Sequence, residues 1–368
     1  MNTGTIKLMK ILILSPYDAP SHQYWWKGLV NQFSEHKCTV ISLPARYFSW
    51  RFRGNSLTLS QDLRLQDSYD LIIATSMTDL SALRGLCPRI ISTPTIFYFH
   101  ENQFAYPDLG NKHHLVERQI TSIYAALAAD ALVFNSRFNQ ESFLSGVAAL
   151  LRKLPDGIPP GITEKLLDKS QIISVALEPM SDPKEDNSVK KGECFNIVWN
   201  HRWEHDKGCD ELATFVSLLL ESDIDFTFHL IGQKFRKVPE GIKESLSLLK
   251  ENNRLGHSGF IEDKQQYHRL LRDSHLVLST ARHEFQGLAV LEAIQAGCMP
   301  VVPDALAYQE FVPKENRYQN LGQALALVEK CFHANLSANK ITTATLPIGV
   351  DQKVVFEAWG VLLADLSL

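Results

Sequence analysis

The sequence has no long apolar run, no short-period repeat and no low-complexity tract. None of its apolar stretches approaches the roughly 18 to 20 uninterrupted residues that a membrane-spanning helix needs. The opening MNTGTIKLMK holds neither the apolar core nor the cleavage site of a signal peptide. These absences argue against fibrous and membrane-spanning classes. We therefore expect a soluble protein of the cytoplasm with no membrane partner.

Clustered cysteine and strong charge of one sign are also missing. The six cysteines stand far apart, with no CxxC pair and no His/Cys cluster, so we expect free thiols, no metal site and no disulfide framework. A net charge of −4 argues against a strongly basic nucleic-acid binder. The charge is uneven, because residues 1–180 hold 17 Lys and Arg against 15 Asp and Glu, whereas the remainder holds 20 against 26. A polyanionic partner would therefore favour the first half.

The sequence does contain a regular alternation of short apolar runs with helix-like stretches. This pattern is typical of doubly wound, parallel α/β sheets. The 368 residues exceed one ordinary core and suit two such domains. Strands are predicted at 11–16, 38–44, 70–76, 95–100 and 131–136 in the first half, and at 195–200, 226–232, 257–261, 275–280 and 299–304 in the second.

A change of composition separates the two series of strands. The stretch MSDPKEDNSVKKGE, from Met180 to Glu193, is charged and nearly free of apolar residues, which favours a linker. We predict an N-terminal Rossmann-like domain over 1–185, a C-terminal one over 186–350 and a closing helix over 351–368. This helix either caps the second domain or crosses back to the first.

The most informative segment is STARHEFQGLAVLEAIQAGCMPVVPD, residues 279–304. It predicts a strand, a loop with Glu284 and Gly287, and a helix that starts near Leu288. The N-terminus of such a helix offers unpaired backbone N–H groups and about half a positive charge, which suits a phosphate. Glu292, in the second turn, is either a solvated surface residue or, because LAVLEAIQAG is so apolar, a partly buried carboxylate that needs partners.

A second polar cluster, NHRWEHDKGCDEL, follows the first strand of the second domain. Arg202 and Lys207 stand in this strand-to-helix loop, and Gly208 permits a tight entry into the helix. Two cations at that position suit a diphosphate, whose negative charge grows as it leaves a sugar. The alternative to a diphosphate site is a solvated surface loop whose charges pair locally.

Together these residues carry a family resemblance. RWEHDKG, GFIEDKQQYHRLLRDSHLVLST and HEFQGLAVLEAIQAGCMPVV resemble the C-terminal domain of retaining GT-B glycosyltransferases of family 4. ILILSPYDAPSHQYWWKGL, LPARYFSWRFRGNSLTLSQ, FYFHENQFAYP and ALVFNSRFNQESFL are similar to its tRNA-queuosine alpha-mannosyltransferase branch. The similarity covers nearly the whole chain, although the usual Gly-Gly turn after the first strand is absent.

The resemblance implies a donor site in the C-terminal domain. Arg202 and Lys207 would hold the donor diphosphate, Gly287 and Leu288 would offer backbone N–H groups, and Glu292 would bind the nucleotide ribose. No cofactor is implied, since a nucleotide sugar, GDP-mannose, is the co-substrate. No DxD-type motif stands where it could bind a metal ion, so we expect Lys, Arg and a helix dipole to replace one.

The resemblance also implies the transfer chemistry. The four catalytic positions would be His100, Glu284, Lys207 and Arg202. Glu284 would contact the donor sugar, and His100, in the HEN motif, would face that sugar from the acceptor side. The alternative for His100 is a structural histidine. The anomeric configuration would be retained by front-side attack, with the leaving phosphate helping to deprotonate the acceptor.

The implied acceptor is tRNA that carries queuosine, bound by the first domain. RYFSWRFRG interleaves arginines with aromatic residues, a pattern that can stack on unpaired bases and grip phosphates. Alternatively, these aromatics are core and the arginines extend to solvent. Acceptor contacts are expected from Ser21, His22, Arg46, Arg51, Arg53, Glu101, Asn102 and Lys112.

Two other functions remain open at this point. One is a GT-B glycosyltransferase that acts on a lipid or cell-envelope acceptor, and the other is a non-catalytic RNA-binding protein on the same fold. The joint presence of Arg202, Lys207, Glu284 and Glu292 speaks against the second. We expect a monomer.

Overall fold

A computed structural model of the chain describes residues 8–106, 112–180, 194–336 and 346–366. The chain divides into two compact units. The first comprises Met1–Ala176 together with Gln352–Leu368, and the second comprises Leu177–Asp351. The first boundary lies between Ala176 and Leu177, just ahead of the predicted linker, most of which (181–193) is outside the described part of the chain.

The first unit is built on a six-stranded sheet in the order β2-β1-β3-β4-β5-β6, in which every pair of neighbours is parallel. The chain runs from β1 outward to β2 and then returns to place β3 on the other side of β1. The strands are β1 (Lys10–Asp18), β2 (Lys37–Pro44), β3 (Leu71–Thr75), β4 (Thr95–Phe99), β5 (Ala131–Phe134) and β6 (Ser170–Ile172).

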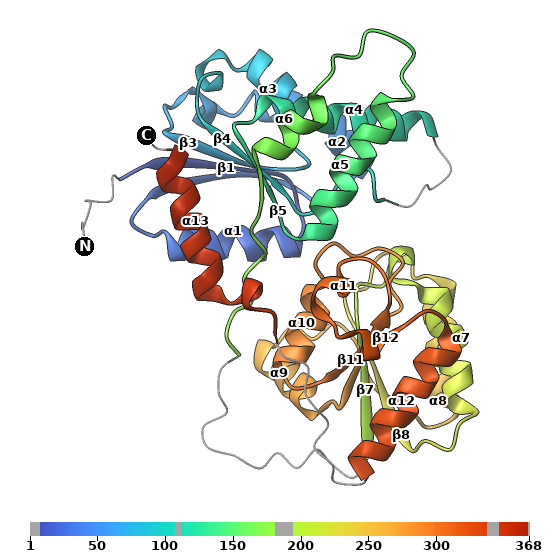
Figure 1. Cartoon of the computed structure of the whole chain (residues 1–368). Coiled ribbons are helices and arrows are strands. Elements are labelled where there is room, and N and C mark those ends of the chain that lie inside the picture. Colours follow the sequence, from blue (N-terminus) through green and yellow to red (C-terminus); the bar gives the residue numbers. More distant parts are fainter. Residues whose placement is uncertain (1–7, 107–111, 181–193, 337–345, 367–368) are drawn as a thin grey trace. The chain divides into compact units, whose positions relative to one another are not determined.

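Helices cover both faces of this sheet (Figure 1). They are α1 (Pro20–Gln32), α2 (Phe48–Leu59), α3 (Leu80–Leu86), α4 (Lys112–Ala128), α5 (Arg137–Leu151), α6 (Ile162–Asp168) and α13 (Gln352–Leu366), with single 3₁₀ turns at Leu63–Gln66 and Pro88–Ile90. Figure 1 shows α13 beside α1 on one side of the sheet, although more than 300 residues separate them.

The second unit repeats this architecture with the strand order β12-β11-β10-β7-β8-β9, again all parallel. Its strands are β7 (Phe195–Asn200), β8 (Phe226–Ile231), β9 (Leu255–Gly259), β10 (Leu276–Leu278), β11 (Met299–Pro303) and β12 (Arg317–Tyr318). The prediction of two Rossmann-like, doubly wound sheets, the GT-B arrangement of elements, is thus confirmed.

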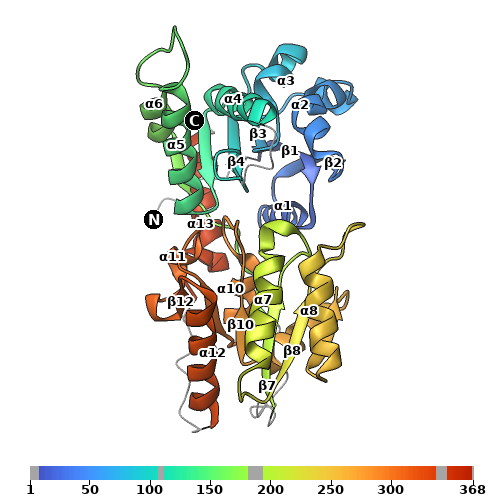
Figure 2. The same ribbon diagram turned by 90° about the vertical axis from the view of Figure 1, so that its right-hand side faces the viewer.

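The helices of the second unit lie in two layers. Figure 2 shows α7, α8 and α12 together on one side of the sheet, and α9 and α10 pack on the other. The helices are α7 (Cys209–Leu220), α8 (Glu240–Glu251), α9 (Lys264–Asp273), α10 (Leu288–Gln295), α11 (Tyr308–Phe311) and α12 (Leu321–Leu336), with 3₁₀ turns at His205–Lys207, Lys314–Asn316 and Ile348–Val350.

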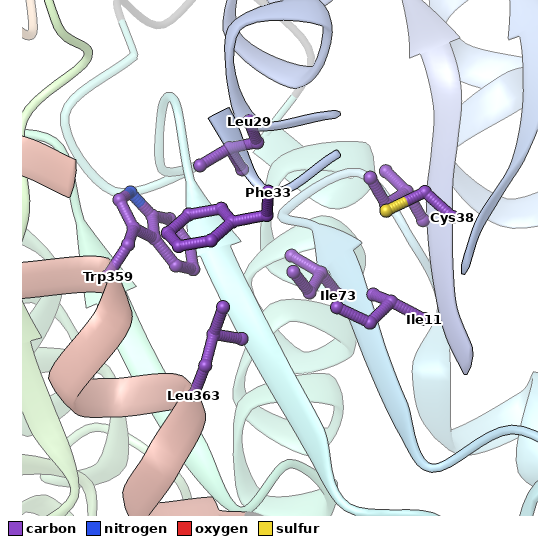
Figure 3. A pocket seen from close by; sticks show the side chains of 8 residues that line it. Ile11, Leu29, Phe33, Cys38, Ile73, Trp359 and Leu363 are labelled. Carbon is purple, nitrogen blue, oxygen red and sulfur yellow. The ribbon is translucent and has the colours of Figure 1, made fainter. Parts of the chain in front are cut away.

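The helix α13 closes the core of the first unit. Its Trp359 is fully buried and stacks near Tyr98 of β4 at a ring separation of 5.7 Å, while Trp25 of α1 lies 6.1 Å from it. Figure 3 shows the small pocket that remains between α1, α13 and the sheet, with Trp359 and Leu363 facing Leu29 and Phe33. Every side chain that lines it is apolar or a thiol, so it offers no polar contact to a sugar nucleotide.

All six cysteines are free thiols, and three of them, Cys87, Cys209 and Cys298, are buried. No helix among the described residues combines the length and the apolar character needed to cross a bilayer.

The packing of α13 makes a stability prediction. Trp359→Ala removes a fully buried indole and should lower the free energy of unfolding by about 3 to 5 kcal/mol. Val361→Ala, two residues further along the same helix but 64% exposed, should change it by less than about 0.5 kcal/mol. Urea denaturation followed by tryptophan fluorescence and circular dichroism measures both. Equal losses in the two variants would show that α13 stabilises the protein through its helix propensity rather than through the packing of Trp359.

Candidate functional site

Both sheets have a switch point, where consecutive connections leave neighbouring strands in opposite directions. In open α/β sheets, ligands bind at the carboxyl edge of this point. In the second unit it lies between β7 and β10, which are neighbours although about 75 residues separate them. The loops that follow these two strands contain Arg202, Lys207, Glu284 and Gly287, so the topology brings together residues that the sequence analysis had singled out separately.

An ion pair between buried Lys207 and partly buried Glu284 joins the two loops. The ammonium of Lys207 lies 3.1 Å from Oε2 of Glu284 and donates to the carbonyl oxygen of His283 at 2.8 Å. Burial alone would lower the pKa of Lys207, but Glu284 and Asp206 raise it above its usual value. Burial alone would raise the pKa of Glu284, but Lys207 lowers it to about 2. Both groups are therefore charged at neutral pH.

The close approach of the loops requires a glycine. Gly208 has a φ of 68°, and a Cβ placed on it would stand 1.8 Å from the carbonyl oxygen of Thr280. The hydroxyl of Thr280 in turn donates to the carbonyl oxygen of Lys207 at 2.9 Å and accepts from the indole N–H of Trp199 at the same distance. The backbone around Lys207 is thus fixed to the opposite loop without any contribution from the Lys207 side chain.

Asp206 stands between the two cations. Its carboxylate lies 3.3 Å from the Lys207 ammonium and 3.9 Å from the Arg202 guanidinium, which also pairs with Glu204 at 2.9 Å. The Arg202 side chain is 44% exposed, in contrast to Lys207. The loop therefore presents one fixed, buried cation and one exposed cation that can exchange its carboxylate partner for another anion.

A neutral histidine lies behind the ion pair. Burial and then the charge of Lys207 lower the pKa of His201 to about 3. Its Nε2 lies 2.9 Å from the hydroxyl of Ser279, which lies 2.7 Å from the hydroxyl of Tyr308. Three buried side chains, two that directly follow β7 and β10 and one from α11, therefore share one hydrogen-bond chain, which supports the Lys207–Glu284 pair from the interior.

The helix α10 begins at Leu288, at the edge of the same site. Its N-cap is Gly287, with a φ of 79°, and a Cβ there would stand 3.1 Å from the rings of Tyr308 and Phe311 and 3.6 Å from Cγ of Glu284. Glycine thus permits both the left-handed conformation and the packing. The first N–H groups of a helix have no partner within it, so this end of α10 can donate to an anion.

Glu292 is partly buried on α10 and does have a partner. Its Oε2 accepts a hydrogen bond from the hydroxyl of Tyr267 at 2.5 Å, and that hydroxyl accepts one from the Asn200 amide at 2.7 Å. The amide nitrogen of Asn200 can only donate, so the direction of the hydrogen bonds from Asn200 through Tyr267 to Glu292 is fixed. Burial raises the pKa of Glu292, and the bond from Tyr267 opposes this. One carboxylate oxygen is engaged, which leaves the other to accept from a ligand hydroxyl.

The first unit places His22 and His100 together near the carboxyl edge of β1 and β4. Their rings stack with centroids 4.0 Å apart, and Nε2 of His22 lies 3.7 Å from a carboxylate oxygen of Glu101. Burial and His22 lower the pKa of His100 well below its usual value, so its ring is neutral. Within the described residues, Nδ1 of His22 and Nε2 of His100 are buried without a hydrogen-bond partner.

Buried hydroxyls without a partner also lie at the end of β3, the strand between β1 and β4, and directly after it. They are those of Thr75, Ser76 and Thr78. Buried polar groups in folded proteins are nearly always paired, so an unpaired group asks for a water molecule or a ligand. Together with the two imidazoles they make the carboxyl edge of the first sheet polar.

Other predicted acceptor residues are engaged inside the unit. The Asn102 amide donates to Asn139 at 2.8 Å and to Ser142 at 2.9 Å, and its oxygen accepts from two backbone N–H groups of the following turn. Asn102 thus shapes the loop after β4. Arg53 pairs with Asp79 at 2.7 Å and with Glu117 at 3.2 Å, which ties α2 to α3 and α4.

The remaining predicted acceptor residues are more open. Arg46 is exposed and stacks on Tyr47 with 5.7 Å between the guanidinium carbon and the ring centroid. Arg51 is half-buried on α2, and Ser21 is exposed in the first turn of α1. Lys112 is the first residue of α4, and its side chain lies outside the described residues. These residues do not join the His22–His100 pair in any contact described above.

Four residues around Lys207, Glu284 and Glu292 were not predicted from the sequence. His201 and Asp206 stand inside the charged loop NHRWEHDKG, where the density of ionisable groups could have included them. Asn200 and Tyr267 gave no local signal, because they meet Glu292 only through the fold. Within the described residues, no group of three or more His, Cys, Asp or Glu is arranged to hold a metal ion.

Comparison with known families matches both halves of the chain. Residues 10–177 match the family described as tRNA-queuosine alpha-mannosyltransferase N-terminal, and residues 182–322 match glycosyl transferases group 1. A tRNA-queuosine alpha-mannosyltransferase of Drosophila melanogaster is 34% identical over 331 residues, which cover 88% of this chain and 86% of that protein.

Solved structures share the fold. HepE of Anabaena, in complex with UDP and glucose, gives a TM-score of 0.69 at 17% identity and covers 97% of this chain and 100% of its own. An alpha,alpha-trehalose-phosphate synthase of Burkholderia xenovorans, in complex with glucose-6-phosphate, gives 0.69 at 12% identity, with 98% and 100% covered. At such identities the likeness establishes the GT-B fold and nothing finer.

The ion pair of Lys207 and Glu284 predicts a pH dependence of stability. Because the folded pKa of Glu284 is about 2 against a usual value of 4.5, the ionised carboxylate stabilises the fold above pH 4.5, and this contribution is lost as the pH falls toward 2. Glu284→Gln should lower the free energy of unfolding by about 3 kcal/mol at pH 7. The deficit should shrink between pH 4.5 and pH 3.

Urea titrations at pH 7, 4.5 and 3 measure this difference. Glu244→Gln, at an exposed position of α8, is the control and should match the parent protein at every pH. A deficit of Glu284→Gln that does not change with pH would contradict the charge assignment.

Proposed function

The chain belongs to the tRNA-queuosine alpha-mannosyltransferase family and is a glycosyltransferase, and we propose that it moves mannose from GDP-mannose to queuosine in the anticodon loop of tRNA. The acceptor group would be a hydroxyl of the cyclopentene diol of queuosine. We further propose that the anomeric configuration is retained. The observation that carries the proposal is the largely buried pair of Lys207 and Glu284 at the switch point of the second sheet.

The donor diphosphate would lie between the two loops of the second unit. Lys207 is charged, buried and fixed by Glu284, so it can neutralise phosphate without a reorganisation cost. Arg202 is exposed and would release Glu204 to form a bidentate contact. The N–H groups at Gly287 and Leu288, at the start of α10, would complete the anion site.

The sugar and the nucleoside would be held by the two carboxylates. Glu284 has a pKa of about 2, so it stays ionised and can accept hydrogen bonds from the hydroxyls of the donor sugar. Glu292 keeps one oxygen for the ribose, since Tyr267 engages the other. Names of relatives and neighbours support a nucleotide-sugar donor: HepE of Anabaena binds UDP and glucose, and the Drosophila protein is a mannosyltransferase.

The transfer step needs positioning and charge more than a protein nucleophile. As the bond between the anomeric carbon and the diphosphate breaks, negative charge grows on the phosphate oxygen, and Lys207 and Arg202 would stabilise it. The same oxygen can take the proton of the incoming hydroxyl as that hydroxyl attacks from the same face. His100, which is neutral, can accept or donate one hydrogen bond at its free Nε2 and so orient the reacting groups.

The acceptor would be bound by the first unit. His22, His100 and Glu101 stand at the carboxyl edge of its sheet, and each of the two imidazoles keeps one buried nitrogen atom without a partner, which suits a small diol. We retain Ser21, Arg46, Arg51, Arg53 and Lys112 as proposed contacts to the tRNA and assign Asn102 the task of shaping the loop after β4. Their strengths would differ, because Arg53 already has two carboxylate partners.

We propose that the enzyme works as a monomer in the cytoplasm, where its tRNA substrate is found. A lipid or cell-envelope acceptor is the second candidate, and it is disfavoured because residues 10–177 match the tRNA-queuosine branch specifically. A non-catalytic RNA-binding role is disfavoured by the Lys207–Glu284 pair, because a largely buried ion pair is costly to keep without a task.

Incubation of queuosine-containing tRNA with a panel of UDP- and GDP-linked hexoses tests the function. Mass analysis of the released nucleosides should show one hexose added to queuosine with GDP-mannose alone. Lys207→Ala combined with Glu284→Ala should reduce the rate by at least about a hundredfold, because the phosphate loses its fixed cation. Transfer to a lipid fraction, with no gain of mass on the nucleoside, would refute the acceptor assignment.

The charges of Lys207 and Arg202 also predict independence from metal ions. Since fixed cations and a helix terminus take the role that Mg²⁺ has in other transferases, full activity should remain in excess EDTA. The rate of transfer before and after chelation measures this. Loss of activity that only a divalent cation restores would refute the prediction.

The exposed Arg46 predicts a salt-dependent contact with tRNA. Arg46→Glu should weaken tRNA binding several-fold at low salt and leave the affinity for the free donor unchanged. Arg89→Glu, an exposed change in the same unit in the turn that leads into β4, serves as the control and should have little effect. Fluorescence anisotropy with labelled tRNA at several salt concentrations measures both. Equal effects would indicate bulk charge rather than a contact.

A further inference from the structure

The loop after β8 carries cations without acidic partners. Lys234, Phe235, Arg236 and Lys237 are consecutive and all exposed. Within the described residues, none of the three cations forms an ion pair, whereas other cations of this unit do. Examples are Arg254 with Asp225, Lys264 with Glu178, and Arg282 with Glu211 at 2.6 Å.

The charge of the surroundings makes this loop unusual. The half of the chain after residue 180 has 20 Lys and Arg against 26 Asp and Glu. Three cations within four residues repel one another, and among the described residues no carboxylate pairs with them to offset this repulsion. Such a local patch, rather than net charge, decides whether a polyanion binds. The loop is therefore a candidate for an anionic partner.

The base of the loop is fixed while its tip is open. The N–H of Trp203 donates to the carbonyl oxygen of Gln233 at 3.0 Å, and the N–H of Gly232 donates to that of Gly259 at 3.1 Å. The ammonium of Lys234 lies 4.8 Å from the centroid of the Trp203 ring. Lys234 is thereby held against the neighbouring loop, and the following residues extend from an anchored turn.

We infer that residues 234–237 are a second tRNA-binding surface, in which Arg236 and Lys237 contact backbone phosphates and Phe235 offers a ring to an unpaired base. This inference rests on the proposed function, since tRNA is the polyanion concerned. Alternating cations and aromatic rings are the means by which proteins hold single-stranded nucleic acid. The surface belongs to the same unit as the donor site, so both units bind tRNA.

Charge reversal of the tip tests this surface. Arg236→Glu with Lys237→Glu leaves the anchoring Lys234 in place. The dissociation constant for unmodified tRNA should rise by about tenfold at 0.1 M salt, and the slope of its logarithm against log salt should fall by about 2. The matched control is Lys250→Glu with Lys330→Glu, an equal change of net charge at exposed positions of α8 and α12. Donor affinity should be unchanged in both.

Several outcomes would overturn the inference. These are unchanged tRNA binding, an equal loss in the control variant, a loss of donor affinity instead, or reduced binding to phosphatidylserine vesicles with tRNA binding intact. If the reversed variant folds poorly, Arg236→Gln with Lys237→Gln should give a smaller loss of the same kind, and no loss there would also overturn it. Because unmodified tRNA is the probe, this result is independent of hexose transfer. Failure of the parent protein to modify queuosine would refute the proposed function without refuting the tRNA-binding surface.

Discussion

The donor side of the molecule depends on one interaction, the largely buried ion pair of Lys207 and Glu284. Removing two charges from water costs several kcal/mol for each ion, and the pair offsets this only when its geometry is held closely. The structure holds it through the backbone, since the Thr280 hydroxyl binds the Lys207 carbonyl and Gly208 lets the loops touch. The cation is therefore in place before any ligand arrives.

The pair also organises its neighbours. His201 is kept neutral by burial and by the charge of Lys207, so it can belong to the hydrogen-bond chain through Ser279 and Tyr308. Asp206 balances the excess positive charge of the loop and links Lys207 to the exposed Arg202. The site is charged, with a fixed cation at Lys207 and an exposed, adaptable one at Arg202. This combination suits the binding of an anion followed by its release.

The first unit holds buried polar groups of two kinds, and the difference separates structure from function. The amide of Asn102 has every hydrogen bond it can use, and so it fixes a turn. The imidazoles of His22 and His100, by contrast, have free nitrogen atoms although both are buried. The two rings stack at 4.0 Å, and each keeps a nitrogen atom that can exchange a hydrogen bond with a ligand hydroxyl.

The sequence predicted the strands well because most of them are apolar runs between clear helical stretches. It missed β6 and β12, which have only three and two residues and so no measurable periodicity. It brought Lys207 and Glu284 to one site through recognisable motifs. The roles of Tyr267 and Asp206 at this site were not predicted. Arg53 was expected to contact tRNA, whereas the structure pairs it with Asp79 and Glu117. The fold decides which partners a polar side chain meets across a long sequence separation. The periodicity of the sequence does not contain this information.

The return of α13 to the first unit has a consequence for how the protein is made. All six strands of the first sheet are synthesised by residue 172, but Trp359, which covers their face beside Trp25, comes only after the whole second unit. A nascent chain must therefore carry an uncovered apolar surface while some 175 further residues are translated. Slow elongation through the second unit would prolong the exposure of that surface to chaperones and to aggregation.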